Sequence, residues 1–269
     1  MPLLISGGDS FTWGSELPDQ RMNHMVNKPS TSTWSALIAK HYNMDYICTA
    51  KPGGANNTIV RRIIKEINAH KGEEIFVAVM WTFTHRSETR LKNLHKLFES
   101  AVVAARYDID DSWINFNAWH GLPLDEKMSF FNQNISDWGR RYFREQHDKL
   151  TEIGVTEASE KFYKITGDYV YHNLQTLKDI CLLQYYCKRH NIPYFFCTAS
   201  DELLITQAPE VIESGLYDDV FWDNWYHDAA FHPWAKNHPQ CGNHPGIEAH
   251  SDWFNLILPK VSQCFMQNK

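Results

Sequence analysis

The stretch LLISGGDSF, residues 3–11, says more about the architecture than any other part of the chain. Residues 3–6 are apolar enough for a buried strand, and the glycine-rich polar turn that follows ends the strand at once. A serine at such a junction, here Ser10, is held out of the sheet, where it can act as a nucleophile. We therefore predict a first strand with Ser10 at its carboxyl end.

Apolar runs recur along the chain and alternate with helical patterns. Strands are predicted at residues 46–48, 75–81 and 193–198, and helices at about 34–39, 58–67, 88–105, 170–191 and 246–259. Parallel strands need long crossover connections, and helices supply them. The expected fold class is therefore a three-layer α/β/α sandwich with a parallel sheet of about five strands in a flavodoxin-like order.

The chain length fits one sizeable core, so residues 1–269 are expected to form a single domain. Residues 106–160 depart from the strand–helix rhythm because they are polar, aromatic and helical in pattern. We expect a helical insertion there, acting either as a lid or as an oligomerisation element. The sequence is compatible with a homo-oligomer but does not indicate one.

Composition narrows the function classes. The net charge is −6 and no basic block stands out, which disfavours nucleic-acid binding. No apolar run approaches the ~20 residues that span a bilayer, and the first residues lack the pattern of a signal peptide. The six scattered cysteines are expected to be reduced core residues. These features indicate a cytoplasmic protein without membrane partners.

Three polar sites follow predicted strands. Ser10, the pair Gly53-Gly54 and Thr82 each come directly after an apolar run. The carboxyl ends of parallel strands meet at one edge of a sheet, where α/β proteins place their binding sites. We expect the three to meet there.

Three blocks of sequence resemble those of the SGNH, or GDSL-type, hydrolases. Gly8-Asp9-Ser10-Phe11 is similar to the first block, Gly54-Ala55-Asn56-Asn57 to the second and His244-Pro245-Gly246 to the last. The string GDSFTWG also resembles uncharacterised phage-type members. The resemblance implies an esterase without a cofactor, in which Ser10 is the nucleophile and His244 the base.

The same resemblance implies an oxyanion hole, with two departures. The Ser10 and Gly54 amides would donate to the oxyanion, but the usual asparagine is replaced at Thr82, whose hydroxyl is expected to donate instead. The usual aspartate three residues before the histidine is Cys241. Asp201, just after the fourth strand, is the first candidate to orient His244. Asp223, Asp228, Asp252 or a backbone carbonyl are the alternatives.

The expected substrate-binding residues are Trp81, Asn57 and Trp225. For the aromatic segment around residues 222–234, packing against the core is the competing and slightly favoured reading. Asn57 has a helix-capping alternative, and His250 is expected to be a packing residue. A zinc site of Cys241, His238 and His244 is a further alternative, but its spacing fits no standard pattern, so no metal is expected.

The predicted function is hydrolysis of an ester, with a small O-acyl group on a carbohydrate as the suggested substrate. Two alternatives remain open at this point. One is an acyltransferase that passes the acyl group to a sugar or nucleotide hydroxyl. The other is a non-catalytic binding or structural protein on the same fold, favoured by the two missing family residues.

Overall fold

The computed structural model describes residues 1–21, 28–90, 113–116, 137–152, 154–166, 168–205 and 207–266. The chain divides into two compact units, which are treated separately. The first unit joins Met1–Thr84 to Asn173–Lys269, and the second is His85–His172. The first unit contains the main sheet and every candidate site residue. The expectation of a single domain stays a prediction.

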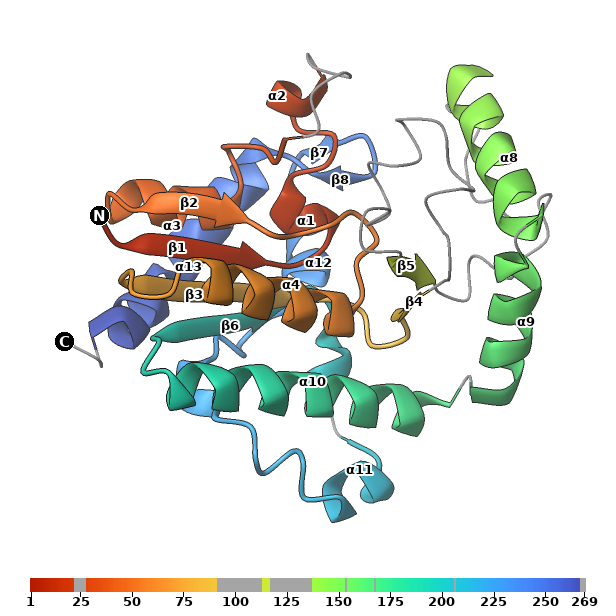
Figure 1. Cartoon of the computed structure of the whole chain (residues 1–269). Helices are drawn as coiled ribbons and strands as arrows, with labels where there is room; N and C mark the ends of the chain where they lie inside the picture. The colour runs from red at the N-terminus through yellow and green to blue at the C-terminus, as the bar shows by residue number, and fades with distance from the viewer. Residues whose placement is uncertain are drawn as a thin grey trace. The chain divides into compact units, whose positions relative to one another are not determined.

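The centre of the first unit is a parallel sheet. Its strands are β1 (Leu3–Gly7), β2 (Asp45–Cys48), β3 (Ile75–Trp81) and β6 (Tyr194–Thr198), in the order β2-β1-β3-β6 (Figure 1). Every residue of β1, β3 and β6 is buried, as expected of parallel strands that are covered on both faces. The predicted α/β class with a parallel sheet is confirmed.

The described sheet has four strands, where the sequence predicted about five. At the free side of β6 a single parallel bridge joins Phe196 to Trp225. The Tyr226 amide also donates to the Phe196 carbonyl at 2.9 Å. The position of a fifth strand is therefore taken by a loop that pairs at one residue only.

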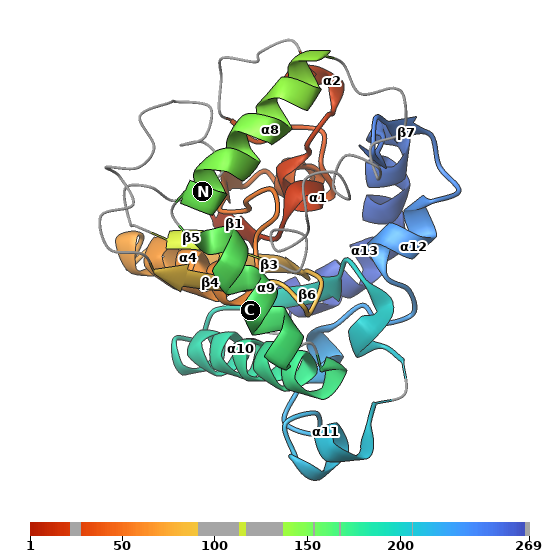
Figure 2. The same ribbon diagram turned by 90° about the vertical axis from the view of Figure 1, so that its right-hand side faces the viewer.

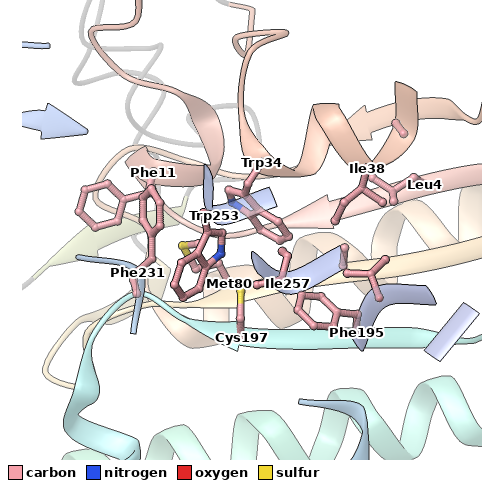
Figure 3. Packing of buried hydrophobic residues seen from close by; sticks show 14 of the residues in the cluster. Leu4, Phe11, Trp34, Ile38, Met80, Phe195, Cys197, Phe231, Trp253 and Ile257 are labelled. Carbon is pink, nitrogen blue, oxygen red and sulfur yellow. The ribbon is translucent and has the colours of Figure 1, made fainter. Parts of the chain in front are cut away.

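Helices cover both faces of the sheet. Helices α3 (Trp34–His41) and α13 (Ile247–Met266) lie on one face, and α4 (Asn56–Ala69) and α10 (Tyr169–Arg189) lie on the other (Figures 1 and 2). Figure 3 shows the first interface, where Trp34, Phe195 and Ile257 pack between sheet and helices. This arrangement is the predicted three-layer sandwich.

Short elements complete the first unit. They are α1 (Ser10–Trp13), α2 (Pro18–Arg21), η3 (Asp201–Leu203), α11 (Pro209–Glu213), η4 (Trp222–Asn224), α12 (Phe231–Ala235), β7 (Gln240–Cys241) and β8 (His244–Pro245). Within the described ranges, no helix has the length and apolar character needed to cross a membrane.

The second unit corrects one prediction. Its elements are β4 (Ser87–Arg90), β5 (Trp113–Phe116), α8 (Asp137–Glu152) and α9 (Val155–Thr166). The helix predicted from residue 88 is a strand at its start, because β4 pairs antiparallel with β5, a partner that local pattern does not reveal. About half of the expected insertion at residues 106–160 lies outside the described residues, and α8 and the start of α9 make up most of its described part.

None of the six cysteines forms a disulfide, and four of them are buried. Burial raises the pKa of Cys264 to about 11 and that of Cys187 to about 12. Thiols with such raised pKa values remain protonated and inert at neutral pH. The four buried cysteines are core residues, as predicted, whereas Cys48 and Cys241 are only partly buried.

Candidate active site

Ser10 is the first residue of α1, directly after the turn that ends β1. The Asp9 carboxylate caps this helix by accepting from the Phe11 amide at 3.0 Å. Gly8 is required for the tight turn, since a Cβ there would lie 2.1 Å from the Thr12 hydroxyl oxygen. The Ser10 side chain is thus fixed at the carboxyl edge of the sheet, buried but for 8% of its surface.

A buried polar network ties this turn to the neighbouring strand. The second Asp9 carboxylate oxygen accepts from the Thr82 hydroxyl at 2.7 Å. The Asn56 side-chain carbonyl accepts from the Thr82 amide at 2.9 Å, and the Asn56 amide group donates to Thr176 at 3.1 Å. The ends of β1 and β3 and the first turn of α4 are therefore held together, as expected for a shared edge.

This network corrects the role predicted for Thr82. A threonine hydroxyl has one proton to donate, and that of Thr82 goes to Asp9. Thr82 is also fully buried. Its hydroxyl therefore positions Asp9 and, through Asp9, the turn that carries Ser10, rather than donating to an oxyanion.

Gly54 closes a tight turn at the end of β2. Its amide donates to the Lys51 carbonyl at 2.8 Å, and Gly53 between them has a φ of +73°. Proline at the second position and a positive-φ glycine at the third are typical of a type II turn. Gly54 lies beside Gly8: a Cβ on Gly54 would be 3.5 Å from the Gly8 carbonyl oxygen. Its amide proton, expected at the oxyanion, is used within the turn.

His244 is the first residue of β8, which a two-residue turn, Gly242-Asn243, joins to β7. Gly242, the first turn residue, has a φ of +69°, as such a hairpin requires. The His244 Nδ1 lies 2.7 Å from Glu16 Oε2, and the Asn243 amide donates to the same oxygen at 2.7 Å. A carboxylate only accepts, so Nδ1 carries the proton. The Nε2 of His244 is then the nitrogen available as a base.

The carboxylate beside His244 is therefore Glu16, and the prediction of Asp201 was wrong. Asp201 is exposed at the start of η3. Glu16 occupies a left-handed backbone position with φ +66°. Its carboxylate lies against Gly242. A Cβ on Gly242 would be 2.6 Å from Glu16 Oε2. No family block or spacing marks Glu16, so sequence reasoning missed it.

Phe11 joins the serine turn to the histidine. Its ring meets the His244 ring edge-on, with centroids 5.7 Å apart, and stacks on the His232 ring at 5.6 Å. The Phe231 ring also contacts the Phe11 ring, with centroids 5.6 Å apart. Among the described residues, the Ser10 hydroxyl has no hydrogen bond to His244. The imidazole is nonetheless held against the residue that follows Ser10.

The two tryptophans expected to bind substrate lie in the core. Trp81 and Trp225 are fully buried, and both pack edge-on against Phe196, at 5.3 Å and 5.5 Å between centroids. Neither ring has a face exposed to a ligand, so the prediction was wrong for both and the packing alternative holds for Trp225. Asn57 is partly buried and its side-chain oxygen accepts from the Thr58 amide at 3.1 Å.

His250 lies in the first turns of α13 and is buried, as predicted for a packing residue. Its Nδ1 accepts from the Trp34 amide at 3.4 Å, and its ring packs on Phe231. Burial, and secondarily the charge of nearby His244, lower the pKa of His250 to about 3. The folded protein therefore holds this ring neutral.

We expect His250 to destabilise the fold in acid. Between the unfolded pKa of 6.5 and the folded value of about 3, only the unfolded chain takes up this proton. The free energy of unfolding should then fall by up to about 1.4 kcal/mol per pH unit more than in His250→Gln. Urea titrations at several pH values measure this difference. A gap between the two proteins that does not change with pH would contradict it.

The histidines of the aromatic segment serve packing and ion pairs in the described structure. The His238 ring packs at a tilt on Trp234 with centroids 4.2 Å apart, and its Nε2 lies 3.5 Å from an Asp252 carboxylate oxygen. Within the described part of the chain, no three His, Cys, Asp or Glu side chains are grouped closely enough to hold a metal ion. The observed partner of His244 is Glu16.

Comparisons with known proteins add little to this geometry. No protein-family description matches the sequence, and no curated protein matches it either. Among solved structures, the chain is similar to an extracellular lipase from Streptomyces rimosus, at 13% identity and a TM-score of 0.33. That match covers 97% of this chain and 100% of the lipase. The functional argument therefore rests on the residues themselves.

Proposed function

We propose that this protein is a serine ester hydrolase with Ser10 as the nucleophile, His244 as the base and Glu16 as the carboxylate that orients the base. The observation that carries the proposal is the 2.7 Å contact between His244 Nδ1 and Glu16. A histidine whose one ring nitrogen contacts a carboxylate, and whose ring packs on the residue after a serine in a tight turn, supports the serine–histidine–carboxylate arrangement used for acyl transfer on unrelated folds.

The proposed reaction has two steps. In the first, Ser10 Oγ attacks the ester carbonyl carbon while its proton moves to His244 Nε2. That proton then passes to the oxygen of the departing alcohol, which leaves an acyl group on Ser10. In the second, water attacks the acyl carbon, His244 takes its proton and returns it to Ser10, and the carboxylic acid is released. Glu16 stabilises the imidazolium that forms in both steps.

The charge on the carbonyl oxygen needs donors at the same edge. The Ser10 amide is one, because it begins α1 and makes no hydrogen bond within the described structure. The amino-terminal end of α4 follows directly after Gly54, beside Gly8, and the positive end of its dipole favours negative charge. Both features support an oxyanion near Ser10.

The proposed substrate is a small acyl ester, such as an acetyl group on a carbohydrate hydroxyl. The low exposure of Ser10, 8%, supports a small acyl group. Phe83 follows β3 at this edge and is half-buried, and partly exposed aromatic rings are common in ligand sites. The ring supports a flat or cyclic alcohol portion.

Hydrolysis of p-nitrophenyl acetate by the wild-type protein tests the proposal. The expected result is saturable turnover that stops after treatment with a fluorophosphonate, since that reagent consumes the activated serine. Turnover no faster than in buffer, or turnover that the reagent leaves unchanged, would overturn it. A series of p-nitrophenyl esters from acetate to octanoate separately tests the preference for a small acyl group. We expect the highest kcat/KM for the shortest esters.

A further inference from the structure

The turn before His244 binds the Glu16 carboxylate through its backbone. The Asn243 amide donates to Glu16 Oε2 at 2.7 Å, and His244 Nδ1 lies 2.7 Å from the same oxygen. Two consecutive residues of the hairpin therefore hold one carboxylate oxygen. Glu16 lies in the loop after α1, 228 residues before His244, so the pairing depends on how closely that loop can approach the turn.

Gly242, the first residue of the turn, leaves the space for this approach. A Cβ on Gly242 would lie 2.6 Å from Glu16 Oε2 and 2.8 Å from both Cδ and Oε1. The whole carboxylate group thus lies where another residue would have its side chain. An ordinary contact begins at 3.4 Å, so a Cβ at this position would push Oε2 back by about 0.8 Å.

That displacement would affect the candidate site more than the fold. Gly242 is exposed, and the Glu16 side chain keeps 39% of its surface exposed, so solvent can receive the displaced carboxylate. A hydrogen bond of 2.7 Å that lengthens by this amount leaves the ~2.7–3.2 Å range of N–H···O bonds. His244 would then lose the group that keeps its proton on Nδ1.

We propose that Gly242 is a positioning residue: the absence of a side chain there lets the Glu16 carboxylate reach His244 and hold its proton on Nδ1. The proposal rests on the proposed ester hydrolysis and adds a turn residue to the machinery that orients the base. Two separate requirements then favour glycine at this position. The turn needs a positive φ, +69° at Gly242, which asparagine also tolerates. The carboxylate needs the empty space, which only glycine provides.

The test is a double-mutant cycle in the full chain. Gly242→Ala is expected to lower kcat for p-nitrophenyl acetate by roughly 10²-fold with KM within about threefold, because misplacing a catalytic group by about 1 Å has an effect of that size. In a Glu16→Gln background, the same change should cost less than about threefold, since no carboxylate remains to be displaced.

The matched control for backbone strain is Gly215→Ala. Gly215 has a similar φ of +72°, but among the described residues nothing would lie within 4 Å of a Cβ there. This variant carries the strain of a positive φ without a displaced carboxylate, and it should retain wild-type kcat.

The outcomes separate this inference from the proposed function. Wild-type protein that neither turns over the ester nor labels at Ser10 with a fluorophosphonate removes the proposed function itself. Wild-type protein that does both, with Gly242→Ala within about threefold in kcat, overturns the role of Gly242 alone. An equal loss from Gly242→Ala in both backgrounds also overturns it, because the effect would then not pass through Glu16.

Thermal unfolding checks that each variant is folded. If Gly242→Ala does not fold, Gly242→Asn takes its place, since asparagine tolerates the positive φ and still has a Cβ. Wild-type kcat in Gly242→Asn would overturn the proposal, whereas a loss like that expected for Gly242→Ala supports it.

Discussion

Ser10→Ala is expected to lower the rate of ester hydrolysis by at least about 10³-fold, with a far-ultraviolet spectrum and melting temperature like those of the wild type. In the proposed reaction this hydroxyl forms the covalent intermediate, so its removal should stop the first step. The fold should tolerate the change, because Ala retains Cβ and the turn is held by Asp9 through the Phe11 amide and Thr82. Steady-state hydrolysis of p-nitrophenyl acetate measures the loss.

The control for Ser10→Ala is Ser15→Ala, which changes the partly buried serine just after α1. This control should retain wild-type kcat, because its hydroxyl has no part in the proposed reaction. If Ser10→Ala kept more than about a tenth of the wild-type rate, the hydrolysis would not depend on this nucleophile.

Glu16→Gln should lower kcat by about 10³–10⁴-fold while KM changes little. The amide keeps the size of the side chain but can present an N–H to His244 Nδ1, which favours the tautomer with its proton on Nε2. That tautomer cannot accept the Ser10 proton. The Asn243 amide donates to the same Glu16 oxygen at 2.7 Å, so a glutamine that turns its N–H toward Nδ1 also loses that contact. Kinetics over a range of pH measure the effect.

Two comparisons sharpen the Glu16 result. Glu16→Asp retains the charge on a shorter side chain and should recover part of the rate that Glu16→Gln loses. Glu213→Gln removes a charge from an exposed residue at the end of α11 and should have no effect. Equal activity of the wild type and Glu16→Gln would show that Glu16 holds the hairpin without taking part in the chemistry.

The sequence predicted the layers of the fold because each central strand has an uninterrupted apolar run. Residues 75–81 are such a run, and β3 has the same bounds, Ile75–Trp81. The start of the helix predicted at about 88–105 was wrong because Ser87–Arg90 pairs with Trp113–Phe116, about 25 residues away; residues 91–105 lie outside the described residues. Pairing at that separation overrides local preference and leaves no mark in the local pattern.

The candidate site was predictable where it depends on position along a strand and not where it depends on side-chain geometry. Ser10 and Thr82 meet at one edge because both follow parallel strands. The partner of His244 was not predictable, since it depends on the left-handed backbone at Glu16 and on a hairpin 228 residues away. The burial of Trp81 and Trp225 could not be predicted either. An aromatic residue near a strand end fits either a binding cleft or the core.

The direct test of the central claim is to label the protein with a fluorophosphonate and to map the modified residue by peptide mass spectrometry. We predict a single adduct on Ser10 in the wild type, none in Ser10→Ala and much slower labelling in Glu16→Gln. An adduct on another residue, or no adduct in a folded wild-type protein, would contradict the assignment of Ser10 as an activated nucleophile.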